Sequence, residues 1–203
     1  PTPKPKPNPS DDFSTAEVNS DIWEVKNHTT GTLSQGSGKL TFTETGSGNS
    51  GPQLRTKYRI DQAEFVVSAK VSLESGTLPN TAFLLQVAYT DDPIDAVQIM
   101  TVVDALGVVR MATGYYSANT YQTHGPTIAP GSAELILRIQ KTALNFVLSY
   151  DVGAASTVLT TIPISSSPRT SCCRSSMTTE SLRSCSRTWP RSSVKARLRI
   201  SRK

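Results

Sequence analysis

The chain has 203 residues, of which 36% are apolar, and a formal net charge of +5. The charge is unevenly distributed, because residues 1–165 carry 11 Lys and Arg against 15 Asp and Glu, whereas residues 166–203 carry 10 against one. The part of the chain able to fold is therefore mildly acidic, which argues against a nucleic-acid-binding domain. No apolar stretch approaches the roughly 18 residues of a membrane-spanning helix, so we expect no membrane span.

The chain begins with proline at every second position from Pro1 to Pro9. Proline fixes φ and removes backbone donors, which favours an extended polyproline II conformation. We therefore expect residues 1–10 to be a semi-rigid Pro/Lys-rich linker that joins an upstream domain to the rest of a modular protein. The alternative is a PxxP ligand for a partner domain.

Residues 11–165 consist of short alternating runs separated by turn residues. The clearest run is 65–73, where an apolar residue stands at every second position from Phe65 to Leu73, as a strand with one solvent-facing side requires. We expect ten strands, at residues 22–26, 39–43, 53–58, 65–73, 81–90, 96–103, 108–113, 134–140, 144–150 and 157–162. Strands at this spacing without intervening helices predict an all-β domain, an antiparallel sandwich or barrel.

Residues 166–203 contain eleven Ser and eight Arg, and they hold all three cysteines, Cys172, Cys173 and Cys185. With so few large apolar residues, we expect a disordered, low-complexity basic tail. The abrupt change in composition has two interpretations, a native tail or a frameshift in the coding sequence. The odd cysteine count argues against a disulfide framework, and the spacing matches no zinc site.

Several segments resemble the concanavalin A-like lectin/glucanase superfamily, the jelly-roll sandwiches that include laminin G-like modules. These segments are Asp11–Ser14 with the Trp strand 22–24 and the short strand 38–42, the long strands 65–73 and 83–89, and the hairpin 133–140 with 144–151. The resemblance covers most of residues 11–165. It implies a jelly-roll arrangement of two antiparallel sheets, and it suggests a role in binding carbohydrate.

Catalytic motifs are missing from the sequence. Retaining glycosidases need two carboxyl groups about 5 Å apart, which this superfamily places close together on one strand. No Glu-x-Asp-x-x-Glu motif occurs, and neither a G-x-S-x-G motif nor a phosphate-binding glycine loop is present. We therefore expect the chain not to be an enzyme, although acids distant in sequence can still meet in space.

The best candidate for a ligand site is the polar, aromatic stretch 115–124. Sugar rings present apolar faces edged with hydroxyl groups, so aromatic platforms beside amide and hydroxyl side chains suit them. The candidate ligand-binding residues are Tyr115, Tyr116, Asn119, Tyr121, Gln122 and His124. The alternative is that Tyr115 or Tyr116 packs in the core while the rest forms an ordinary loop.

Asp91, Asp92 and Asp95 supply hard oxygen ligands, so they are a candidate structural Ca²⁺ site. The spacing is not that of an EF-hand and Pro93 interrupts it, so the alternative is a solvated turn. We expect no other cofactor.

Together these observations predict a non-catalytic carbohydrate-binding or adhesion module of a secreted or cell-surface protein, with a polysaccharide as its partner. The alternative function is a structural or protein-interaction spacer that uses an exposed sheet face or edge.

Overall fold

The computed structural model describes residues 11–26, 31–44, 52–57, 64–73, 81–88, 96–117, 120–132, 134–164, 174–181 and 192–201. The strands are β1 (Trp23–Lys26), β2 (Gly31–Gly36), β3 (Lys39–Glu44), β4 (Gln53–Thr56), β5 (Phe65–Leu73), β6 (Thr81–Ala88), β7 (Ala96–Val103), β8 (Val109–Ser117), β9 (Thr120–Thr123), β10 (Glu134–Lys141), β11 (Asn145–Val152), β12 (Ala155–Pro163), β13 (Arg174–Ser181) and β14 (Ser192–Ser201). Each of the ten expected strands is present, and β2, β9, β13 and β14 are additional.

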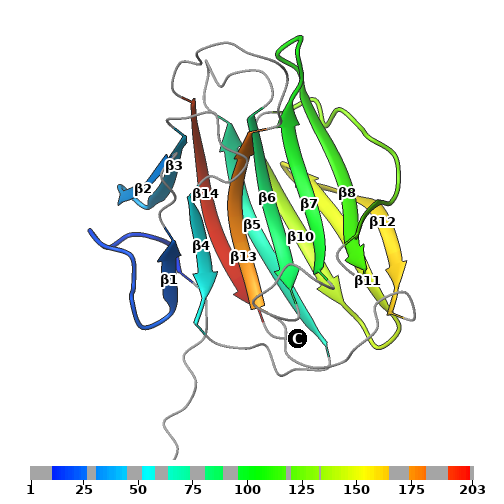
Figure 1. Ribbon diagram of the computed structural model, residues 1–203, viewed down its shortest axis with the longest axis horizontal. Helices are drawn as coiled ribbons and strands as arrows, with labels where there is room; N and C mark the ends of the chain where they lie inside the picture. The colour runs from blue at the N-terminus through cyan, green and yellow to red at the C-terminus, as the bar shows by residue number, and fades with distance from the viewer. Residues whose placement is uncertain are drawn as a thin grey trace, which may run out of the picture.

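The strands form two antiparallel sheets. Sheet I has the order β1-β4-β13-β6-β7-β8-β9, and sheet II has the order β12-β11-β10-β5-β14-β3-β2. Figure 1 shows the two sheets as stacked layers, with β1 to β3 at one side of the molecule and β8, β11 and β12 at the other. The all-β, two-sheet antiparallel sandwich predicted from the sequence is confirmed.

The core lies between the sheets and follows the alternation of the strands. On β5, the buried residues Phe65, Val67, Ala69 and Val71 face the core, and the same alternation recurs on β6, β10 and β11. Phe42 of β3 packs edge-on against Phe83 of β6, with ring centroids 5.9 Å apart, and so joins the two sheets. Each such buried aromatic side chain contributes about 1.5–3 kcal/mol through removal from water.

The structure differs from the sequence-based expectation in the basic tail. β13 lies between β4 and β6 in sheet I, and β14 lies between β5 and β3 in sheet II. In Figure 1 they run through the middle of the molecule in orange and red. The sequence of β14 alternates apolar Val194, Ala196, Leu198 and Ile200 with three basic residues, which is a strand pattern that the overall composition of the tail conceals.

The segment before β1 is anchored by Asp11. Its Oδ2 accepts a hydrogen bond from the indole Nε1 of Trp23 at 2.9 Å, and its Oδ1 accepts one from the backbone N–H of Phe13 at 2.8 Å. Phe13 is fully buried and has a φ of 55°, a left-handed conformation that is unfavourable for a bulky residue. The two hydrogen bonds and the contact between the Phe13 and Trp23 rings hold it in place. Residues 1–10, the expected linker, lie outside the described residues.

Candidate functional site

The alternation of β8 separates the two neighbouring tyrosines of the candidate site. Met111 belongs to the core, and Tyr115 packs against this core, so both residues lie on the core side of β8. Arg110, Ala112, Gly114 and Tyr116 occupy the intervening positions and therefore lie on the outer face of sheet I.

Tyr116 pairs with Tyr121 across the β8–β9 hairpin. Their ring centroids are 5.3 Å apart and the planes are tilted by 52°, within the range of favourable aromatic contacts. The Tyr121 ring lies directly over Gly114, because a Cβ built on Gly114 would come within 2.5 Å of two ring carbons and the hydroxyl oxygen of Tyr121. Both tyrosines are half-buried, so part of each remains accessible. We call this pair the tyrosine platform.

Two glutamine amides extend the tyrosine platform across the sheet. Gln98 of β7 is the register partner of Gly114, and Gln86 of β6 is the register partner of Gln98. The Nε2 of Gln86 donates a hydrogen bond to the Oε1 of Gln98 at 3.1 Å. Gln98 is only 4% exposed, whereas Gln86 is half-buried, so Gln98 orients the more accessible amide. The outer face of sheet I thus combines aromatic rings with an ordered amide.

The remaining candidate residues of stretch 115–124 take other positions. Gln122 is the register partner of Tyr115, so it lies on the opposite side of the hairpin from the tyrosine platform. His124 is on that side too, with its ring centroid 6.0 Å from that of Tyr115. The backbone of His124 is fixed by Thr113, whose carbonyl accepts its N–H at 2.9 Å. Asn119 lies outside the described residues.

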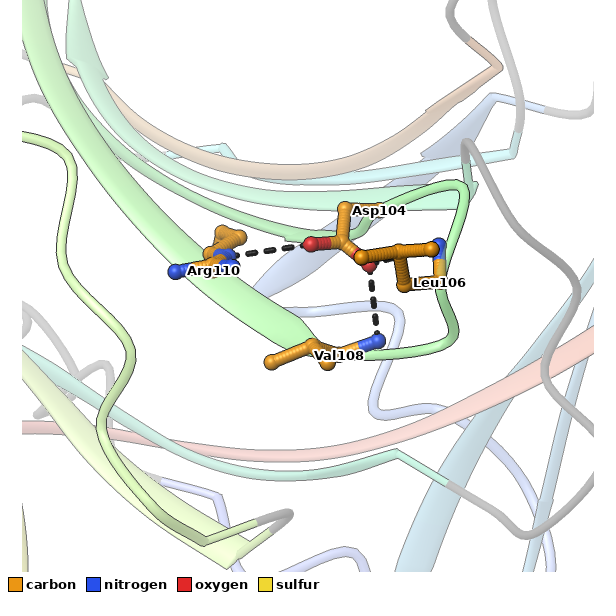
Figure 2. A network of polar contacts seen from close by, with 4 residues as sticks. All are labelled: Asp104, Leu106, Val108 and Arg110. Atoms are coloured by element: carbon orange, nitrogen blue, oxygen red, sulfur yellow. Dashed lines mark hydrogen bonds and ion pairs between the residues drawn. The ribbon is translucent and has the colours of Figure 1, made fainter.

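A second polar group lies at the other end of β8, where Asp104 organises the β7–β8 turn (Figure 2). Its Oδ1 accepts hydrogen bonds from the backbone N–H groups of Leu106 and Val108, each at 2.9 Å. Its Oδ2 accepts a hydrogen bond from the Nε of Arg110 at 3.0 Å. The bond from Val108, followed by that from Arg110, lowers the pKa of Asp104 below its ordinary value. The carboxylate therefore stays ionised and holds Arg110 on the outer face of sheet I.

The outer face of sheet II carries paired charges instead of aromatic residues. Arg138 of β10 donates to the Oδ2 of Asp151 of β11, with its Nε at 3.0 Å. Burial raises the pKa of Asp151, but hydrogen bonds from Arg138 and Ser156 outweigh it, and the net pKa lies below the ordinary value. Lys70 pairs with the exposed Glu134 on the same face. These pairs are most simply cross-strand contacts that stabilise the sheet.

The candidate calcium ligands Asp91, Asp92 and Asp95 all lie outside the described residues. Within the described part of the chain, no group of three or more His, Cys, Asp or Glu side chains is placed to hold a metal ion. The same part of the chain contains no helix with the length and hydropathy needed to cross a bilayer.

Sequence reasoning singled out the tyrosine platform but missed Gln86, Gln98, Gly114 and Arg110. The sequence does contain a signal for Gln98, because it stands between the apolar Val97 and Ile99 and must therefore face away from the core.

Comparison with known proteins shows a shared fold. No family model matches the chain, and no curated protein matches its sequence. Among solved structures, LamAcat from Zobellia galactanivorans superposes with a TM-score of 0.70 at 12% identity, covering 95% of this chain and 96% of the other. The Bacillus licheniformis β-glucanase gives 0.68 at 12% identity, covering 95% and 97%. The Bacteroides ovatus protein described as xyloglucan PUL GH43B gives 0.67 at 15% identity, covering 94% of this chain but only 39% of its own length.

These similarities confirm the two-sheet jelly-roll fold that the resemblance to the concanavalin A-like lectin/glucanase superfamily implied. They also correct one prediction from the sequence, that the chain is not an enzyme. Structures that share the sandwich over nearly its whole length include a glycoside hydrolase family 16 endo-glucanase, a β-glucanase and a glycosyl hydrolase family protein. The exclusion failed because it relied on a contiguous acid motif, whereas a sandwich can bring together acids that are distant in sequence.

Proposed function

We propose that this sandwich binds a polysaccharide on the outer face of sheet I, with the tyrosine platform as the surface on which a sugar ring stacks. The observation that carries the proposal is the pair of half-buried rings of Tyr116 and Tyr121, with the ordered amide of Gln86 two strands away on the same face. The ring faces suit the apolar C–H side of a sugar, and the amide suits its hydroxyl groups.

Two features of the tyrosine platform support recognition rather than simple packing. The rings lie on the opposite side of β8 from Met111 and Tyr115, so the sandwich core does not need them. Their position is also fixed before any ligand arrives, because the missing side chain of Gly114 leaves the space that the Tyr121 ring occupies. A preorganised aromatic surface loses little conformational entropy on binding.

The fold supports the same class of ligand. Proteins with similar structures include a β-glucanase and a GH16 protein of the Bacteroides ovatus mixed-linkage glucan PUL in complex with its G4G4G3G product. We therefore take a glucan as the first ligand to test. As a further part of the proposal, we place the protein outside the cell, where polysaccharides of this kind are found.

The experiment uses the full chain, a glycan array and isothermal titration with soluble glucans. We compare the wild type with Tyr116→Ala, Tyr121→Ala and a matched control, Val158→Ala, which removes an exposed apolar side chain from sheet II. Circular dichroism verifies that each variant keeps its fold. A reducing-end assay on any bound glucan then tests whether the sandwich also cleaves it.

We expect both tyrosine variants to lose binding by about tenfold or more, since stacking on an aromatic side chain contributes on the order of 1–3 kcal/mol. Val158→Ala should bind as the wild type does. Unchanged binding in both tyrosine variants would place the ligand elsewhere and refute the site. Absence of binding to every glycan would favour a structural or protein-interaction role.

A further inference from the structure

We propose that Arg110 recognises an acidic group, a carboxylate or a sulfate, on the polysaccharide, and that sheet I therefore prefers anionic glycans over neutral ones. The inference rests on the proposed function and adds a specificity-determining residue to it.

Among the described residues, Arg110 is held through only one of its three guanidinium nitrogens. Asp104 engages only the Nε of Arg110, at 3.0 Å, and the Arg110 side chain is 39% exposed. The two terminal amino groups make no hydrogen bond or ion pair with the residues that the structure describes. Figure 2 shows a terminal nitrogen pointing away from Asp104. Arg110 therefore offers a fixed pair of donors, the arrangement that binds carboxylate and oxyanion groups in a bidentate manner.

The terminal donors of Arg110 lie on the same face of the sheet as the tyrosine platform. Arg110 and Tyr116 occupy the same face of β8, six positions apart, which corresponds to about 20 Å along a strand. Of the outward residues between them, Ala112 has a small side chain and Gly114 has none, so no bulky group of β8 stands between the cation and the tyrosine platform. A sugar chain stacked on the tyrosine platform and running along β8 would reach Arg110.

The β7–β8 turn is held closed by hydrogen bonds that do not involve Arg110. The N–H of Asp104 donates to the carbonyl of Val108, and the N–H of Gly107 donates to the carbonyl of Asp104, so the backbone already closes the turn. The Oδ1 of Asp104 adds two more bonds from the backbone. The turn thus has four hydrogen bonds that do not involve Arg110, and the ion pair with Asp104 serves mainly to orient the guanidinium.

Long-range electrostatic attraction is not specific to this site, because the full chain has a net charge of +5 and attracts any acidic polymer. A preference that arises locally, from the donors of Arg110, is therefore distinguished by comparison with a variant that removes the same charge elsewhere on the surface.

The test measures the affinity of the full chain for three polymers by titration: neutral xyloglucan, carboxylated polygalacturonate and sulfated dextran. The variants are Arg110→Gln, the conservative Arg110→Lys, and Tyr116→Ala. The matched control is Lys70→Gln, which removes the same charge from an exposed position on the outer face of sheet II.

We expect the wild type to bind at least one acidic polymer more tightly than xyloglucan, and the polymer that is preferred identifies the acidic group. Arg110→Gln should weaken that binding by about tenfold or more, because hydrogen bonds to charged groups are worth more than neutral ones, while xyloglucan binding stays unchanged. Arg110→Lys should retain part of the preference, and Lys70→Gln all of it.

Equal affinity of the wild type for neutral and acidic polymers would overturn the inference, as would an acidic preference that survives in Arg110→Gln. Either result leaves the proposed function standing if Tyr116→Ala still abolishes binding. Failure of the wild type to bind any of the polymers would overturn both.

Discussion

Replacement of Gly114 by alanine tests whether the position of the Tyr121 ring matters for binding. Gly114 lies within β8 and does not have a positive φ, so alanine suits its backbone. The new Cβ would come within 2.5 Å of the far end of the Tyr121 side chain, and the ring must therefore move. We expect Gly114→Ala to displace the ring from the tyrosine platform while the strands stay paired.

Gly114→Ala changes the free energy of unfolding in two opposing ways. Overpacking costs about 1–3 kcal/mol, and the loss of glycine flexibility in the unfolded chain returns about 0.4–1 kcal/mol. A net loss of about 1–2 kcal/mol lowers the melting temperature by roughly 2–8 °C for a chain of this length. Glucan affinity should fall by about tenfold or more if the sugar stacks on Tyr121.

The assay combines calorimetric melting with titration of a soluble glucan. Gly36→Ala is the matched control, because its Cβ would meet nothing within 4 Å and it lies on β2 of the other sheet. Wild-type glucan affinity in Gly114→Ala would refute the reasoning that the fixed ring is the binding surface. The reasoning would also be refuted if Gly114→Ala lost no more glucan affinity than the control Gly36→Ala.

Three further predictions concern stability. Asp11→Ala should cost about 1–3 kcal/mol in urea unfolding, because it leaves the Trp23 indole N–H without its acceptor. Asp151→Asn should be less stable than the wild type at neutral pH. The pKa of Asp151 is lower in the folded than in the unfolded state, so its carboxylate stabilises the fold at neutral pH and this stabilisation is lost as the pH falls below about 4. The difference in stability between the wild type and Asp151→Asn should therefore vanish in acid, and a difference that stays constant in acid unfolding curves would contradict the prediction. Truncation after Ile164 removes β13 and β14 and should abolish cooperative thermal unfolding measured by circular dichroism, whereas a sharp transition would show that the gaps in both sheets can close.

The sequence predicted the regularly alternating strands of residues 11–165, and it missed two polar edge strands as well as β13 and β14 in the basic tail. The runs at 65–73 and 134–140 alternate so regularly that their strands could be placed almost to the residue. β2 and β9 were missed because each is the last strand of its sheet and is largely polar, with most of its side chains exposed or half-buried. An edge strand buries little apolar surface, so periodicity carries little information about it.

The candidate site was only partly predictable for a different reason. The aromatic stretch pointed to Tyr116 and Tyr121, but β8 and β9 divide its residues between two faces, so proximity in sequence was misleading. The contributions of Gln86 and Gln98 depend on the register between β6, β7 and β8. Register follows from the conformations of the connecting segments and from packing, neither of which a pattern of single residues contains.

The position of β13 and β14 has a consequence for the order in which the protein can fold during synthesis. Each is made after the other twelve strands, yet each takes an interior place in its sheet. While they remain in the ribosome, β4 and β6 lack their shared neighbour, and so do β3 and β5. The nascent chain therefore exposes unpaired strand edges until almost all of these 203 residues have been translated, and it depends on rapid completion or on chaperones to avoid association with other chains.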